Sequence, residues 1–222
     1  MLFLPNSANV PERGWCRVKS EQLGPYALTC PPEVFPLGQD ALALGRFAPV
    51  RPGWRVCDLG TGSGVLLLLL AGREPSLDLW GVELDPRSAQ AARDNLASNG
   101  LRGTVLTGDL REPLLPAGGF DLAVANPPYF PAGSGKGADP ARMELTCTLD
   151  QLCAAAARLV KNGGRFALCH RPERLADVIC ALRGRGLEPK RLKLLSHGPG
   201  HAPSLLLVEA RKQGRPGLVI EP

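Results

Sequence analysis

A glycine-rich turn between two apolar runs has the residue types of a ligand-binding loop. Residues 58–64 read Asp-Leu-Gly-Thr-Gly-Ser-Gly. Glycines at Gly60, Gly62 and Gly64 would let the backbone turn tightly and approach a ligand closely. The spacing differs from the G-x-G-x-x-G fingerprint of dinucleotide sites, and Asp58 would repel a phosphate. A carboxylate at this position favours a cationic or amine-bearing ligand.

Two further carboxylates follow the next two apolar runs of the chain. Glu83 ends the run that begins at residue 77, where a carboxylate can accept both hydroxyls of a ribose. Asp109, followed by Leu110, comes after a third run and is placed to bind an adenine amine. Together with Asp58, these groups describe a nucleoside that carries an amino acid group and no phosphate. S-adenosylmethionine fits this description, although each carboxylate alone could be a helix cap or a solvated loop end.

A proline-braced turn, Asn126-Pro127-Pro128-Tyr129, ends a fourth apolar run. Two consecutive prolines make a rigid backbone that cannot continue a strand ladder. The Asn126 side-chain oxygen and the Pro127 carbonyl can accept two hydrogen bonds from one planar NH2 group, and Tyr129 can stack on its ring. Such acceptors aim the nitrogen lone pair at a methyl donor, so catalysis would be positioning and electrostatics. We predict that these four residues are catalytic and that Asn126 also borders the cofactor.

Apolar runs alternate with helical patterns over most of the chain, which predicts an α/β, Rossmann-like domain. We expect a mostly parallel seven-stranded sheet with a C-terminal antiparallel hairpin and helices on both faces. Asp85 with Pro86, and the capping box of Thr148 with Gln151, predict two helix starts, and residues 163–164 predict the end of the second helix. Ligands of such sheets bind beyond the carboxyl ends of the strands, which is where the turns above lie.

Composition excludes several classes of protein. The chain has 222 residues, 44% hydrophobic and 21% charged, which indicates a globular domain. We expect residues 1–34 to be an N-terminal extension and residues 35–222 a single domain. The longest apolar run, residues 65–71, is far short of the ~20 residues that span a membrane. Seven cysteines without a C-x-x-C spacing favour a reducing cytoplasm and argue against a metal site.

Charge is unevenly distributed along the chain. Residues 151–222 hold 13 Lys and Arg against 5 Asp and Glu, a net charge of +8, whereas residues 1–150 have a net charge of −3. A basic third on a near-neutral body indicates a polyanionic partner. Seven basic side chains of this third are expected at the edge of the sheet that holds the Asn126 turn. They are Arg171, Arg174, Lys190, Arg191, Lys193, His197 and His201. Residues 131–142 are expected to be a lid over the target base.

At these motifs the chain resembles the class I S-adenosylmethionine-dependent methyltransferases that act on planar amines. In finer detail it resembles the bacterial valine-tRNA adenine N6-methyltransferase family. The matching stretches are residues 35–42, 58–64, 82–85, 126–130 and 203–210. The resemblance implies that Asp58 and the glycines hold the methionine end of the cofactor, and that the other carboxylates and the Asn126 turn have the roles given above. Gln39 departs from the pattern, because threonine is expected there.

The acceptor is less narrowly defined than the cofactor. The same Asn-Pro-Pro-Tyr turn occurs in enzymes that methylate adenine in DNA or RNA, guanine in ribosomal RNA and glutamine in release factors. Few residues are left for a separate DNA-recognition domain. Only about fifty residues precede the glycine-rich turn at 58–64, too few for the additional helical domain that release-factor enzymes have there. We therefore favour RNA, most of all tRNA, bound through the basic third. The alternatives are another planar amine, a small-molecule amine, or a non-catalytic RNA-binding module.

Overall fold

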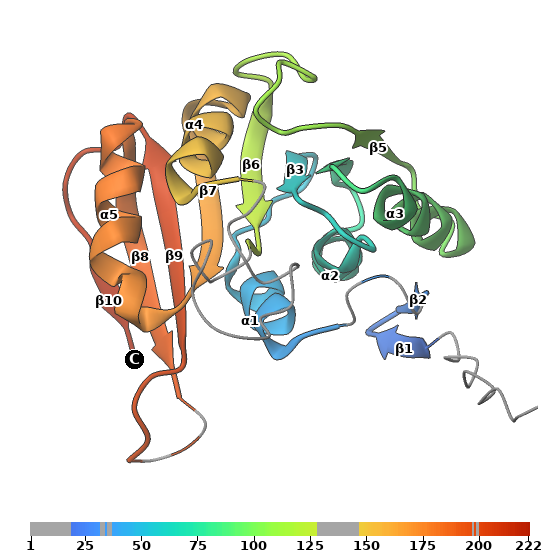
Figure 1. Cartoon of the computed structure of the whole chain (residues 1–222), viewed down its shortest axis with the longest axis horizontal. Coiled ribbons are helices and arrows are strands. Elements are labelled where there is room, and N and C mark those ends of the chain that lie inside the picture. The colour runs from blue at the N-terminus through green and yellow to red at the C-terminus, as the bar shows by residue number, and fades with distance from the viewer. Residues whose placement is uncertain (1–18, 32–33, 35–36, 128–146, 197, 199) are drawn as a thin grey trace, which may run out of the picture.

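The computed structural model describes residues 19–31, 34, 37–127, 147–196, 198 and 200–222, and its main feature is one large sheet (Figure 1). The strands of this sheet are β3 (Arg55–Leu59), β4 (Asp78–Glu83), β5 (Gly103–Thr107), β6 (Phe120–Ala125), β7 (Val160–His170), β8 (Leu187–Leu195), β9 (Leu205–Lys212) and β10 (Val219–Glu221). Their order is β10-β8-β9-β7-β6-β3-β4-β5. Neighbouring strands run parallel, except that β9 is antiparallel to both β7 and β8.

This topology confirms the predicted α/β fold, with mostly parallel strands and a C-terminal antiparallel hairpin of β8 and β9. The sheet has eight strands rather than the predicted seven, because β10 pairs with β8 at the edge. The β10 pairing spans only Val219–Glu221. Three residues are too few for an apolar alternation to reveal a strand.

Helices cover both faces of the sheet, as predicted. One buried apolar cluster joins the sheet to α1 (Gln39–Phe47), α2 (Val65–Arg73) and α3 (Pro86–Ser98). The other joins it to α4 (Leu149–Leu159) and α5 (Leu175–Gly184), which follows a 3-10 turn, Pro172–Arg174. Along β6, Leu122 and Val124 belong to the first cluster, whereas Ala123 and Ala125 belong to the second. None of the helices in the described ranges has the length and apolar character needed to cross a membrane.

Local signals place the helix starts correctly and one helix end incorrectly. The Asp85 side chain accepts a hydrogen bond from the Ser88 backbone N–H (2.9 Å) at the start of α3. Thr148 and Gln151 form the predicted capping box of α4. However, α4 ends at Leu159, and β7 continues through the glycines at 163–164 that were expected to end the helix. These glycines lie where the β6–β7 register shifts, so they serve a bulge in the strand rather than a helix cap.

An N-terminal hairpin, β1 (Lys19–Leu23) and β2 (Tyr26–Cys30), forms a separate two-stranded sheet within residues 1–34, which were expected to be an N-terminal extension. Leu23 and Leu28 are buried in the cluster that contains α1, α2 and α3. The hairpin therefore contributes to the core of the domain. The division of the chain into residues 1–34 and 35–222 stays a prediction.

Candidate functional site

The fold brings the predicted carboxylates and the predicted amide to one edge of the sheet. Strands β3, β4 and β6 are parallel neighbours, so their carboxyl ends lie at the same edge of the sheet. Asp58 lies in β3, Glu83 ends β4 and Asn126 directly follows β6. The buried apolar cluster that contains α1, α2 and α3 includes residues of each strand, among them Val56 of β3, Leu79 of β4 and Val124 of β6. The three polar residues follow these positions by two, four and two residues respectively. Because side chains alternate along a strand, all three belong to the same face of the sheet.

The glycine-rich turn leaves an open surface of backbone beside Asp58. Gly60 and Gly62 have φ of +76° and +54°, a region that side-chain-bearing residues rarely adopt. An added Cβ at either position would meet nothing within 4 Å, so the space outside the turn is open to a ligand. Gly64 differs, because its Cβ would approach the backbone of Ala92 in α3 at 3.3 Å. The first two glycines therefore suit ligand approach, and the third suits close helix packing.

The Asp58 carboxylate is buried and incompletely hydrogen-bonded. Its Oδ2 atom accepts a hydrogen bond from Thr61 Oγ1 at 2.8 Å, whereas its buried Oδ1 atom has no hydrogen-bond partner among the described residues. The pKa of Asp58 is raised to about 7, above all by burial; the Thr61 hydrogen bond lowers it, and the negative charge of Glu83 contributes to raising it. An unpartnered buried acceptor is costly. A cationic amine that donates to Oδ1 would remove this cost and favour the ionised carboxylate.

Glu83 connects the glycine turn to the start of α3. Its Oε2 atom accepts a hydrogen bond from the Gly62 N–H at 2.8 Å, and its Oε1 atom accepts one from the Asp85 N–H at 3.0 Å. These two backbone donors hold the carboxylate in one orientation. Each carboxylate oxygen can accept more than one hydrogen bond, so both retain capacity for a pair of ribose hydroxyls.

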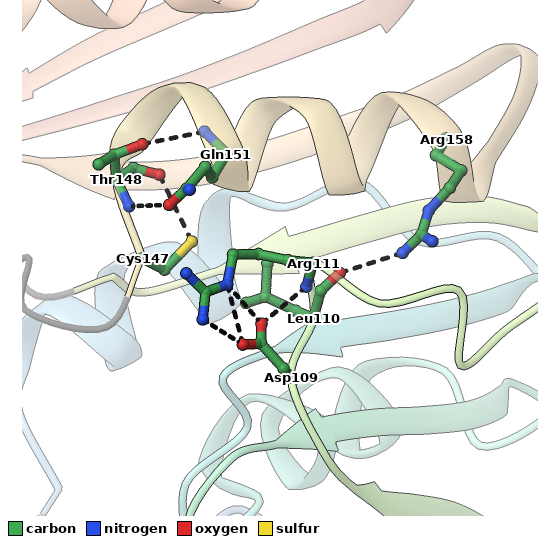
Figure 2. Close-up of polar contacts among 7 residues, drawn as sticks. All are labelled: Asp109, Leu110, Arg111, Cys147, Thr148, Gln151 and Arg158. Carbon is green, nitrogen blue, oxygen red and sulfur yellow. Dashed lines mark hydrogen bonds and ion pairs between the residues drawn. The ribbon is translucent and has the colours of Figure 1, made fainter.

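Asp109 and Leu110 lie in a loop that α4 holds in place (Figure 2). Both carboxylate oxygens of Asp109 accept hydrogen bonds from the Arg111 side chain, and this guanidinium lowers the pKa of Asp109. The Leu110 carbonyl accepts a hydrogen bond from Arg158 Nη2 at 3.0 Å. The pairing with Arg111 was not foreseen. An adenine amine at Asp109 would have to share the carboxylate with this guanidinium or replace it.

The predicted catalytic turn is described only in its first half. Asn126 Oδ1 accepts a hydrogen bond from the Cys169 thiol at 3.0 Å, and Pro127 follows it half-buried. Pro128, Tyr129 and the predicted lid at 131–142 lie outside the described residues.

A buried asparagine that the sequence pattern did not reveal is hydrogen-bonded to the glycine-rich turn of residues 58–64. Asn95 in α3 donates hydrogen bonds from Nδ2 to the Ser63 and Thr29 carbonyls, both at 2.9 Å, and accepts one from the Thr29 N–H at 2.8 Å. It therefore ties the turn to β2. Its position on the apolar face of α3, one residue before the buried Leu96, was the signal that could have revealed it.

The basic side chains expected to contact a polyanion have different environments. Arg191 is half-buried and pairs with both Glu209 and Glu221 at 2.6 Å. Its guanidinium carbon also lies over Phe47, 4.5 Å from the ring centroid. Glu209 is fully buried and also pairs with Arg165. The expectation that Arg191 serves a polyanionic partner at the Asn126 edge is therefore wrong, because Glu209 and Glu221 hold its side chain.

Other members of the basic set remain at the surface. Arg171 and Arg174 follow the carboxyl end of β7, where they pair with Glu173 and Asp177 respectively. His201 is exposed, and His197 lies outside the described residues. Within the described ranges, no group of three or more His, Cys, Asp and Glu side chains is arranged to hold a metal ion.

Comparison with known proteins gives a consistent picture. Residues 42–178 match the family described as methyltransferase small domain. A tRNA1(Val) (adenine(37)-N6)-methyltransferase from Porphyromonas gingivalis is 32% identical over 79% of this chain and 74% of that protein. The protein of the same name from Aeromonas hydrophila is 39% identical over 66% of this chain, and the match spans only 63% of its length.

Solved structures share the fold. A protein from Agrobacterium tumefaciens described as a predicted O-methyltransferase has a TM-score of 0.67 at 25% identity, covering 82% of this chain and 85% of that chain. Geranyl diphosphate C-methyltransferase from Streptomyces coelicolor has a TM-score of 0.58 at 14% identity, covering 77% of this chain and 80% of that chain. The second likeness is one of fold alone.

Proposed function

This chain belongs to the methyltransferase small domain family, and we propose that it transfers the methyl group of S-adenosylmethionine to N6 of an adenine in tRNA. The names of its relatives favour adenine 37 of a valine tRNA as the acceptor. The proposal rests above all on Asp58, whose buried and unpartnered Oδ1 atom lies beside an open glycine turn. A buried carboxylate beside an open glycine turn suits a cationic amino acid group rather than a phosphate.

The residues around Asp58 fit the rest of such a cofactor. The Glu83 carboxylate, oriented by two backbone donors, can accept the ribose hydroxyls. Asp109 can accept the adenine amine in exchange for part of its pairing with Arg111, and Leu110 can contact the adenine ring beside it. When bound, S-adenosylmethionine supplies an electrophilic sulfonium methyl group.

The chain's own contribution to the reaction is to hold the target amine. Asn126 Oδ1 and the Pro127 carbonyl accept one hydrogen bond each from its two N–H groups, and Tyr129 stacks on its ring. Gripping both hydrogens orients the nitrogen lone pair and favours the pyramidal geometry of the transition state. No strong base is required, because the extra proton leaves the nitrogen after the methyl group has been transferred.

We propose that tRNA phosphates contact Arg171 and Arg174, which follow the carboxyl end of β7, at the same edge of the sheet as Asn126. Phosphate contacts release counterions, so the log of the affinity falls with the log of the salt concentration. Replacing both arginines by glutamine should reduce the slope of this plot by roughly two phosphate contacts. An unchanged slope would remove these two residues from the RNA interface.

A tRNA substrate and the scattered cysteines also favour the cytoplasm as the compartment.

The test of the proposed function is methyl transfer to defined tRNA. The purified chain is incubated with labelled S-adenosylmethionine and an unmodified valine tRNA transcript, and the digested nucleosides are identified by mass spectrometry. We expect N6-methyladenosine from this transcript and none from a transcript with guanine at position 37. The Asn126→Ala variant should bind the cofactor normally and lose nearly all turnover. Methyl transfer to a protein glutamine, with no N6-methyladenosine in tRNA, would contradict the proposal.

A further inference from the structure

A fully buried cysteine contacts the amide of the catalytic turn. Cys169 is the second-last residue of β7, and its side chain is 0% exposed. The β6–β7 register pairs Ala125 with Leu168, so one step further along both strands brings Asn126 beside Cys169. The Cys169 Sγ atom lies 3.0 Å from Asn126 Oδ1, with the thiol as donor. This contact joins residues 43 positions apart and follows directly from the pairing of the two strands.

The thiol hydrogen bond has a consequence for the orientation of the carboxamide. Sulfur is a weak acceptor, so a rotated amide that presented Nδ2 to Cys169 would lose the bond from the S–H donor. The buried surroundings make such a polar contact stronger than it would be in water. An amide oxygen has two lone pairs. In the proposed scheme, the thiol donates to this oxygen together with one hydrogen of the target amine.

We propose that Cys169 is a positioning residue for methyl transfer: its thiol holds the Asn126 carboxamide with Oδ1 directed for the target amine. The proposal rests on the proposed function, in which Oδ1 is the atom that grips this amine. A rotated carboxamide would present a donor to another donor and would repel the substrate. Cys169 acts only through Asn126 and has no contact with the reacting atoms in this scheme.

Two substitutions separate the donor from the volume of the side chain. Cys169→Ala removes the donor and should lower kcat about fivefold to tenfold, which is the range of one net hydrogen bond. The affinity for S-adenosylhomocysteine should not change. Cys169→Ser restores an O–H donor at nearly the same size and should recover most of kcat. Equal kcat values in the wild type and in Cys169→Ala would overturn the proposal, and so would equal losses in the alanine and serine variants.

A matched cysteine controls for simple packing effects. Cys153 in α4 is also 0% exposed, but it packs in the cluster on the other face of the sheet. Cys153→Ala and Cys153→Ser should change the melting temperature as much as the Cys169 variants and leave kcat per folded molecule unchanged. A kcat loss that simply follows the melting temperature in all four variants would assign Cys169 a packing role only.

A spectroscopic measurement keeps this inference distinct from the proposed function. In a 15N-labelled sample, the side-chain NH2 resonances of Asn126 are assigned by their loss in Asn126→Ala. These resonances should shift or broaden in Cys169→Ala, return toward the wild-type positions in Cys169→Ser and stay in place in Cys153→Ala. Unmoved resonances in Cys169→Ala would overturn the positioning role. Moved resonances in a protein that methylates no RNA would overturn only the proposed acceptor.

Discussion

Changing the pH should change cofactor affinity through a single buried carboxylate. Burial raises the pKa of Asp58 from its ordinary value to about 7. At pH 6, Asp58 is therefore protonated in most of the ligand-free molecules. The proposed ligand group is an ammonium, which requires the ionised carboxylate. Binding at acidic pH must therefore expel the proton from Asp58. The affinity should fall as the pH falls below about 7, whereas an aspartate with an ordinary pKa would leave it nearly constant down to about pH 5.

The size of the effect follows from a pKa of about 7. The ionised fraction of Asp58 is about one half at pH 7, one tenth at pH 6 and one hundredth at pH 5. If only the ionised form binds, the affinity falls about fivefold between pH 7 and pH 6 and about tenfold more by pH 5. An aspartate with an unshifted pKa would change the affinity by less than about 10% over the same range.

Isothermal titration calorimetry with S-adenosylhomocysteine, which carries the same amino acid group, measures both the affinity and the proton release. Titrations in buffers with different ionisation enthalpies should show about 0.9 proton released per ligand at pH 6 and about 0.5 at pH 7. The Thr61→Ala variant removes a hydrogen bond that lowers the pKa of Asp58. Its pH profile should therefore move to higher pH.

The control is Asp58→Asn, which should bind more weakly at pH 7 and lose the pH dependence. A wild-type affinity that stays constant from pH 5 to pH 7, with no proton release, would refute the reasoning. It would mean that Asp58 is ionised before the ligand arrives or that the ligand's ammonium binds elsewhere.

Two further predictions concern buried polar groups. Asn95→Ala removes three hydrogen bonds to backbone atoms of β2 and of the glycine-rich turn. It should lower the free energy of unfolding by about 2–3 kcal/mol and weaken S-adenosylhomocysteine binding. The control is Asn99→Ala, which removes hydrogen bonds to the backbone of β2 but none to the turn and should leave the binding unchanged. Glu209→Gln removes the fully buried anionic partner of Arg165 and leaves Arg191 with Glu221 as its acidic partner. It should lower the free energy of unfolding by about 3 kcal/mol. Urea denaturation measures both losses, and exposed Glu173→Gln should change the value by less than about 0.5 kcal/mol.

The order of strands and helices was predictable because it depends on short-range patterns. Apolar periodicity located the helices and most strands, and the Asp85 cap and the Thr148–Gln151 box depend on residues three apart. The rule that parallel strands align their carboxyl ends then predicted that Asp58, Glu83 and Asn126 share an edge. Short or irregular segments escaped, including β10 and the glycine bulge of β7.

The contacts that complete the site were not predictable from spacing. Asn126 with Cys169, and Asn95 with the turn at Ser63, join residues that are far apart in the sequence. The ion pair of Arg191 with the buried Glu209 likewise depends on the pairing of two antiparallel strands.

The sequence by itself thus determined which chemical groups are present and at which edge of the sheet they lie, since local periodicity and the alternation of side chains set both. Only the tertiary structure decided which of these groups are buried, which are already hydrogen-bonded and which carry an altered pKa. The physical reason is that desolvation and hydrogen bonding depend on distances across strands and layers, and these distances follow from packing rather than from neighbours along the chain.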